Sequence, residues 1–172
     1  MDGGQGIVIA VTTLGVAGVA MLGENWRSRR NERALRARGS MEVPGDVYPL
    51  MRVAYPACFI ILAVEGIVFG IAAMPWWIVG AVLFLAAKGF KYWAISSLGD
   101  RWTFLVLVPP GEPLVRHGPY RWLDHPNYLA VVGELVGMVV MMGVPLVGTL
   151  SIVGFCVLIA RRITVENRAL GL

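Results

Sequence analysis

Five apolar segments, separated by polar or turn-forming residues, constrain this chain more than any other feature of its sequence. They cover residues 6–22, 53–73, 78–95, 128–143 and 146–160. About 20 apolar residues in a helix cross the hydrocarbon core of a bilayer, and the last two segments, at roughly 16 residues, are slightly short. Only 15% of the residues are charged, and the mean hydropathy is +0.68. We therefore expect an all-α integral membrane protein with about five transmembrane helices in a single domain over residues 1–172.

The connections between these segments differ in length. Pro75 and Val144-Pro145 allow only tight turns, so the last two segments should form a helical hairpin. Two long polar loops cover residues 24–52 and 99–127, and the polar tail 161–172 should continue the fifth helix beyond the membrane. Within the first loop, the arginine-rich run is compatible with a helix that ends at Gly39.

The basic residues indicate an orientation. All fifteen Lys and Arg residues lie in or next to the long loops and the tail, and none lies at the short turns. By the positive-inside rule, the N-terminus is outside, whereas the long loops and the C-terminus are cytoplasmic, as in a multi-pass protein of the inner (plasma) membrane. Lys88 and Lys91 are expected to extend toward the inner headgroups. The sequence leaves the oligomeric state open, although Gly15 and Gly18 would permit close packing of the first helix.

Several kinds of site are absent from the sequence. Cys58 and Cys156 both lie in apolar segments without a neighbouring ligand, so we expect inert thiols and no metal site. Gly4-Gln5-Gly6 precedes a membrane helix and does not follow a strand, which excludes a dinucleotide-binding fingerprint. The basic residues form no stripe with interleaved aromatics, so no nucleic-acid partner is expected.

Carboxylates within apolar segments are candidates for function. Glu65 and Glu134 must face the bundle interior, and the alternative for each is a protonated side chain that hydrogen-bonds to a neighbouring helix. Arg162 and Glu166 are four residues apart on one helical face, in the less favourable order for an ion pair. Simple helix stabilisation is therefore a weak reason for this pair.

The loop residues 116–128 contain both histidines of the chain, His117 and His125, together with two prolines that stiffen the backbone. We expect Asn127 to cap a helix that begins at Tyr128, and the free N–H groups of that helix would suit an anion. The alternative is a connecting loop whose polar residues are merely solvated.

Three motifs carry a resemblance to a known family. They are Leu98-Gly99-x-x-Trp102, Gly118-Pro119-Tyr120 followed by His125-Pro126-Asn127-Tyr128, and Arg162-Ile163-x-x-Glu166-x-x-x-Leu170. Over about residues 95–170 the chain resembles the isoprenylcysteine carboxyl methyltransferase family of membrane enzymes. The upstream segments 31–39 and 48–51 resemble bacterial members that methylate polyketide lipids.

Three residues depart from the pattern of that family. Asp124 stands where an Arg is usual, Asn167 stands where a second Glu is usual, and Tyr55 stands where the bacterial branch has His. We expect Asp124 to pair with Arg121 or with an arginine of the first long loop.

The resemblance implies a methyltransferase that uses S-adenosylmethionine on a lipidic acceptor, most specifically an O-methyltransferase of alkylpyrone or alkylresorcinol-type lipids. Glu166 would hold the methionyl amine, and His125, Arg162 or the helix N–H groups would hold the carboxylate. The implied catalytic residues are His125, Glu134 and Arg162. The implied cofactor-binding residues are Leu114, Val115, His117, Gly118, Tyr120, His125, Pro126, Asn127, Tyr128, Arg162 and Glu166. The implied substrate contacts are Asn31, Tyr48, Trp102 and Glu134.

Four alternatives to this function remain open. Two are methyltransferases that act on a prenylcysteine carboxylate or on the amine of a phospholipid headgroup. The third is a membrane reductase that uses NADPH, and the fourth is a membrane scaffold without catalytic activity.

Overall fold

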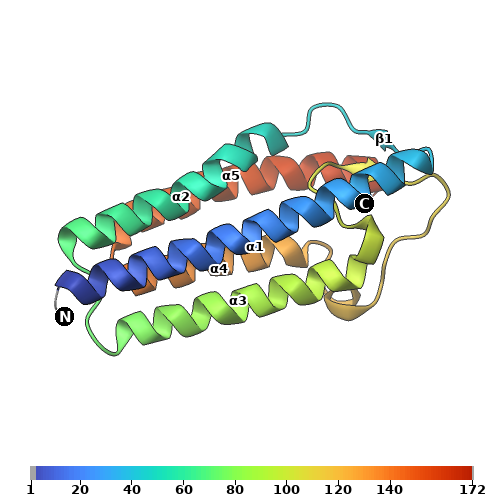
Figure 1. Cartoon of the computed structure of the whole chain (residues 1–172). Coiled ribbons are helices and arrows are strands. Elements are labelled where there is room, and N and C mark those ends of the chain that lie inside the picture. The colour runs from blue at the N-terminus through green and yellow to red at the C-terminus, as the bar shows by residue number, and fades with distance from the viewer. Residues whose placement is uncertain (1–2, 172) are drawn as a thin grey trace.

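The computed structural model describes residues 3–171, which form five long helices lying side by side along one axis (Figure 1). The helices are α1 (Gly3–Ala37), α2 (Tyr48–Phe69), α3 (Trp76–Leu98), α4 (Pro126–Met142) and α5 (Pro145–Leu170). Four are long and apolar enough to cross a bilayer, and α4 is apolar but shorter. This architecture confirms the expected all-α membrane protein.

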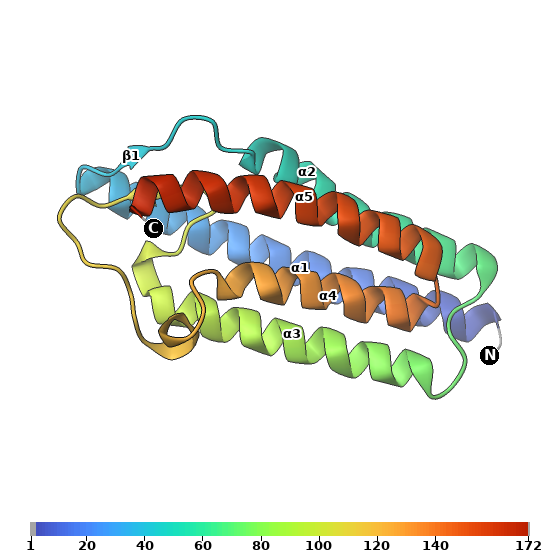
Figure 2. The ribbon, with the colours of Figure 1, turned by 180° about the vertical axis from the view of Figure 1, so that it is seen from behind.

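The two ends of the bundle differ in chemical character. The N-terminus and the short α2–α3 and α4–α5 connections lie at one end, and the long connections and the C-terminus lie at the other (Figures 1 and 2). We call the second end the polar end. It contains a short antiparallel ladder of β1 (Met41–Glu42) and β2 (Leu107–Val108), in which Met41 pairs with Val108. Two single 3₁₀ turns, η1 (Gly99–Arg101) and η2 (Gly118–Arg121), flank the second long connection.

Helix α1 is much longer than the first apolar segment. It continues without a break through the arginine-rich run to Ala37, a length of roughly 50 Å at 1.5 Å per residue, so it extends beyond a hydrocarbon core of about 30 Å. Gly39 then adopts a φ of +85°, which ends the helix. The first long connection was expected over residues 24–52. It covers only residues 38–47, because α1 ends at Ala37 and α2 begins at Tyr48, so the expected boundaries were wrong there. Helix α5 does continue through the tail, as expected.

Helices α3 and α4 approach each other through glycines. A Cβ atom on Gly137 would lie 2.5 Å from the backbone nitrogen of Phe84, and one on Gly80 would clash with the backbone of Met141. Small residues permit this close packing inside a membrane, where van der Waals contact drives helix association. By contrast, a Cβ on Gly15 or Gly18 would meet nothing within 4 Å, so these glycines make no close approach to another helix among residues 3–171, and packing of the first helix against a second copy of the chain stays a prediction.

Candidate functional site

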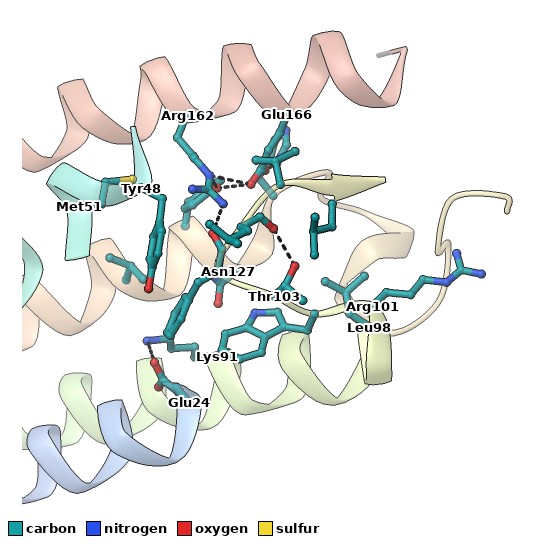
Figure 3. A pocket seen from close by; sticks show the side chains of 18 of the residues that line it. Glu24, Tyr48, Met51, Lys91, Leu98, Arg101, Thr103, Asn127, Arg162 and Glu166 are labelled. Carbon is teal, nitrogen blue, oxygen red and sulfur yellow. Dashed lines mark hydrogen bonds and ion pairs between the residues drawn. The ribbon is translucent and has the colours of Figure 1, made fainter. Parts of the chain in front are cut away.

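A cavity of about 870 Å³ opens within the polar end of the bundle (Figure 3). All five helices and the connection between α3 and α4 contribute to its wall. Apolar side chains such as Met21, Met51 and Phe155 line it together with a buried charged group, so it suits a ligand that is partly apolar and partly ionic.

Arg162 of α5 is the centre of that charged group. Arg162 is only 3% exposed. Its guanidinium donates from Nε to Tyr128 Oη and to Glu166 Oε1, both at 3.1 Å. Nη1 donates to Asp46 Oδ1 at 2.6 Å, and Nη2 donates to the carbonyl oxygen of Phe104. The planar guanidinium therefore joins α5 to α4, to the residues preceding α2 and to the connection after α3.

Glu166 lies one helical turn after Arg162 and receives two further contacts from the start of α4. Tyr128 donates its hydroxyl hydrogen to Glu166 Oε1 at 2.5 Å, and His125 Nδ1 lies 3.2 Å from Glu166 Oε2. The other ring nitrogen of His125, Nε2, lies 2.7 Å from Asn167 Oδ1. Two acceptor oxygens thus face the two ring nitrogens, and only the protonated imidazolium can donate to both. The contact with Glu166 is the main cause that raises the pKa of His125, and that with Asn167 adds to it.

The start of α4 differs from the expected cap. The helix begins at Pro126 after His125, and no side chain caps it. Asn127 is the second residue of the helix instead, and its Oδ1 is buried without a hydrogen-bond partner among the described residues 3–171. Pro126 has no N–H group, and the backbone N–H of Tyr128 donates to the carbonyl oxygen of His125 at 3.2 Å. Because Asn127 lines the cavity, its side-chain amide oxygen and its backbone N–H are therefore the groups at the start of α4 that can meet a ligand.

One side of the cavity is a half-apolar wall from the loop between α3 and α4. Leu114, Val115 and Tyr120 line it. Burial raises the pKa of the Tyr120 hydroxyl, so this side chain remains a neutral donor. The wall therefore suits an aromatic or heterocyclic group.

Helix α1 holds the connection after α3 in place. Asn31 is buried and donates from Nδ2 to the carbonyl oxygens of Gly99 and Trp102, at 3.0 and 2.8 Å. The hydroxyl of Ser28 accepts from the backbone nitrogen of Phe104 at 2.7 Å. Asn31 does not line the cavity, and its amide positions Gly99 and Trp102 instead. Its predicted contact with the substrate remains a prediction.

A second charged group lies deeper in the bundle, between α1, α3 and α4. Lys91 Nζ lies 2.7 Å from Glu24 Oε2, and Lys88 Nζ lies 2.9 Å from Glu134 Oε2. The expectation that both lysines extend to the headgroups was wrong, because each is at most 6% exposed and paired with a buried carboxylate. Glu134 is 0% exposed and accepts a hydrogen bond from Tyr55, so it does not reach the cavity. The predicted contact of Glu134 with the substrate remains a prediction, and the cavity does not support it.

The predicted site residues divide into two sets. Those that line the cavity are Tyr48, Trp102, Leu114, Val115, Tyr120, His125, Asn127, Tyr128, Arg162 and Glu166. Those that do not line it are Asn31, His117, Gly118, Pro126 and Glu134. His117 is exposed on the loop, and Gly118 is packed so closely against Ser97 of α3 that a Cβ would clash. These two residues and Pro126 shape the loop without facing the cavity.

Asp124, which departs from the family pattern, pairs with an arginine other than the ones expected. Its carboxylate lies 3.0 Å from Nη1 of Arg116, and both side chains are more than half exposed. The predicted pairing with Arg121 or with an arginine of the first long loop was wrong, because the Asp124 carboxylate pairs with Arg116. The pair lies at the surface mouth of the cavity, since both residues also line it.

Three polar residues of the site carried no clear signal in the sequence. In the sequence, Asp46 lies in a turn-forming stretch and Glu24 begins an arginine-rich run. Lys91 lies near the end of an apolar segment, where a lysine is expected to extend to the membrane surface. One available cue is that Lys88 and Lys91 share a helical face in an otherwise apolar segment, which favours a buried acidic partner.

The fold and the cavity define a helical membrane protein with a cavity at the polar end of its bundle. Residues 78–171 match the isoprenylcysteine carboxyl methyltransferase (ICMT) family, and the chain belongs to that family. The chain is also 32% identical over 143 residues to the uncharacterized protein YpbQ of Bacillus subtilis (strain 168), covering 83% of this chain and 85% of that protein. It is 22% identical to an uncharacterized protein of Haemophilus influenzae, covering 84% of each. No solved structure matches the chain. Membership of the family implies a membrane methyltransferase.

Proposed function

We propose that the chain is an S-adenosylmethionine-dependent O-methyltransferase that acts on a lipidic acceptor. One observation carries the proposal: a single cavity joins the buried Arg162–Glu166–His125 group to apolar helix surfaces. A polar, zwitterionic methyl donor and a membrane-dissolved acceptor can therefore meet in one enclosed space.

The residues present fit the donor. Its methionyl part carries an ammonium and a carboxylate. Glu166 and the unpartnered Oδ1 of Asn127 would accept from the ammonium, and the His125 imidazolium and the backbone N–H of Asn127 would face the carboxylate. Leu114, Val115 and Tyr120 would contact the adenosine. When bound, S-adenosylmethionine supplies an electrophilic methyl group on a positively charged sulfur.

The role of Arg162 differs from that of a free cation. Its donors already reach Tyr128, Glu166, Asp46 and Phe104. We infer that it holds these groups in position and neutralises Glu166 in the absence of a ligand. The protein thus contributes alignment and a dry site, which are the main requirements of a direct displacement.

The acceptor side of the cavity faces the membrane. Leu22 of α1 lines the cavity and is also 70% exposed on the lipid-facing surface, and the exposed Arg52 of α2 lines it as well. A lipid that enters between α1 and α2 would place its headgroup beside Arg52 and its tail in the bilayer. Among lipids, we propose acidic polyketide lipids of the alkylpyrone or alkylresorcinol type.

The orientation belongs to the same proposal. With the polar end at the cytoplasmic face of the inner membrane, the donor enters from the cytosol, between the loops that carry Arg116 and Asp124.

Calorimetric titration of the detergent-purified protein with S-adenosylhomocysteine tests the proposal. We expect binding that His125→Ala and Glu166→Ala weaken at least about tenfold, and that His117→Ala leaves unchanged. Transfer of a labelled methyl group to extracted lipids then identifies the acceptor. Absence of binding would exclude a methyltransferase, and binding of NADPH instead would favour the reductase.

A further inference from the structure

The cavity has a second polar wall, away from Arg162 and Glu166, where Glu24 of α1 meets Lys91 of α3 (Figure 3). Both residues are buried, at 3% and 2% exposure, and both line the cavity. Their 2.7 Å ion pair has no part in the proposed binding of the methyl donor.

A second ion pair lies behind this one. Lys88 and Glu134 are 2.9 Å apart and do not line the cavity. Cross contacts of 3.6 Å join Lys88 to Glu24 and Lys91 to Glu134. With all four side chains ionised, the group of two acids and two lysines has no net charge. Charged groups at membrane depth are expensive and mark functional sites, and this group exposes only one acid and one base to a ligand.

We propose that Glu24 and Lys91 form the acceptor subsite, and that the acceptor is a lipid with an acidic hydroxyl group: a phenol, an enol or a carboxylic acid. This inference rests on the proposed methyl transfer. Glu24 accepts the hydroxyl proton, and Lys91 stabilises the resulting oxyanion. Glu134 is unsuited to the role of base because Tyr55 and both lysines surround its carboxylate and no part of it lines the cavity.

The Glu24–Lys91 pair suits such an acceptor better than an amine. A weakly acidic lipid hydroxyl, such as a phenol, enters from the bilayer in its neutral form, because ionisation in hydrocarbon is costly. When its proton moves to Glu24, the carboxylate becomes neutral as the acceptor becomes negative, and the buried group keeps its net charge of zero. A neutral amine is already a nucleophile, so its methylation would need no proton acceptor before the transfer and would leave Glu24 without a role.

Methyl transfer begins with loss of the acceptor proton: the acceptor O–H bond breaks and its proton passes to Glu24. The oxygen lone pair then forms the O–CH₃ bond while the methyl–sulfur bond of the donor breaks and leaves its electron pair on a neutral thioether. The proton on Glu24 then returns to water through the polar end. The donor loses its positive charge when its sulfonium becomes a thioether, and one proton is released in exchange.

The test uses the full chain in detergent with three probes of similar tail length: 5-pentadecylresorcinol, 4-hydroxy-6-pentadecyl-2-pyrone and hexadecylamine. The resorcinol is a neutral phenol with a pKa near about 10, whereas the hydroxypyrone is already ionised at neutral pH. Glu24→Gln and Lys91→Met are compared with the wild type. Glu65→Gln is the matched control, because Glu65 is a partly buried carboxylate of α2 that does not line the cavity.

We expect the wild type to methylate the hydroxyl probes and not the amine. Glu24→Gln should lower kcat for the resorcinol about 100-fold and lower that for the hydroxypyrone much less, because an ionised acceptor needs no base. Lys91→Met should lower both rates, and Glu65→Gln should lower neither. Each variant should bind S-adenosylhomocysteine as the wild type does.

If a single variant fails to fold, the double variant Glu24→Gln/Lys91→Met removes the pair without changing net charge, and it should still lose transfer to both hydroxyl probes. Equal losses on both probes in Glu24→Gln together with weakened S-adenosylhomocysteine binding would show a structural role and overturn the inference. Methylation of the amine alone, or of no probe, by a wild type that binds S-adenosylhomocysteine would overturn the acceptor class only. A wild type that does not bind S-adenosylhomocysteine would overturn the proposed function as well.

Discussion

His125 Nδ1 lies 3.2 Å from Glu166 Oε2, which joins the residue preceding α4 to the last turns of α5. The contact is between a loop histidine and a helix carboxylate 41 positions later in the chain (166 − 125). Because Asn167 holds the opposite ring nitrogen at 2.7 Å, the imidazole is fixed in orientation and favoured in its protonated form.

The first prediction is a pH-dependent stability. The hydrogen bond to Glu166 raises the pKa of His125 above the ordinary histidine value of 6.5. The stabilisation from this pair should therefore be complete below pH 6.5 and should decline as the pH rises through the higher folded-state pKa. Thermal unfolding from about pH 6 to about pH 9 should show His125→Gln less stable than the wild type by a few degrees at the acidic end, with a gap that closes at alkaline pH.

His117→Gln is the control for this experiment, because His117 is the only other histidine and is exposed. It should follow the wild-type curve throughout. A gap that widens toward alkaline pH in His125→Gln would contradict the proposed protonation of the pair.

The second prediction concerns the geometry of Arg162. Lysine keeps the charge but cannot reach Tyr128, Glu166, Asp46 and the Phe104 carbonyl at once, because it lacks the planar fork. We expect Arg162→Lys to destabilise the fold by about 1–3 kcal/mol, since buried acceptors lose their donors. S-adenosylhomocysteine affinity should fall at least about tenfold, as measured by calorimetry.

Arg161→Lys is the matched control, because Arg161 is the preceding residue of α5 and is exposed. It should leave both measurements unchanged. Equal behaviour of the two variants would mean that the charge of Arg162, and not its fork of donors, is sufficient.

The sequence was most informative where the relevant residues are close together in the chain. The apolar segments predicted the helices, and His125, Asn127 and Tyr128 all reach the cavity because they lie within one turn of each other at the start of α4. Arg162 and Glu166 reach the cavity together because they share one face of α5. Local spacing therefore accounts for the half of the site that we assign to the methyl donor.

The other half depends on packing between distant segments. Glu24 and Lys91 are 67 residues apart, and Asp46 and Arg162 are 116 apart. The first pairing requires α1 to continue past the expected end of the first membrane segment. The close approach of α3 and α4 through Gly80 and Gly137 is a further contact between separate segments. No periodicity within a single segment encodes such contacts.

The third prediction tests that close approach. A Cβ on Gly137 would lie 2.5 Å from the backbone nitrogen of Phe84, which belongs to a helix and cannot move aside as a flexible side chain can. Gly137→Ala should therefore separate α3 from α4 and destabilise the fold by about 1–3 kcal/mol or more. The measurement is thermal unfolding in detergent.

Gly89→Ala on α3 serves as the matched control, because a Cβ there would meet nothing within 4 Å. It should leave stability unchanged or raise it by about 0.5–1 kcal/mol, since alanine favours the helix. A loss of stability in Gly89→Ala as large as that in Gly137→Ala would point to helix propensity and not to the helix contact.

The fourth prediction is the orientation in the membrane. After replacement of Cys58 and Cys156 by alanine, a single cysteine at Met41 or Met74 reports on opposite ends of the bundle; both methionines are exposed, at 80% and 61%. A membrane-impermeant maleimide should label Met74→Cys on intact spheroplasts and Met41→Cys only after lysis, because the basic residues cluster at the end that contains Met41. The reverse pattern would place the Arg162–Glu166 group outside the cell, away from cytosolic S-adenosylmethionine. That result would exclude the proposed methyl transfer even if the cavity binds the cofactor in detergent.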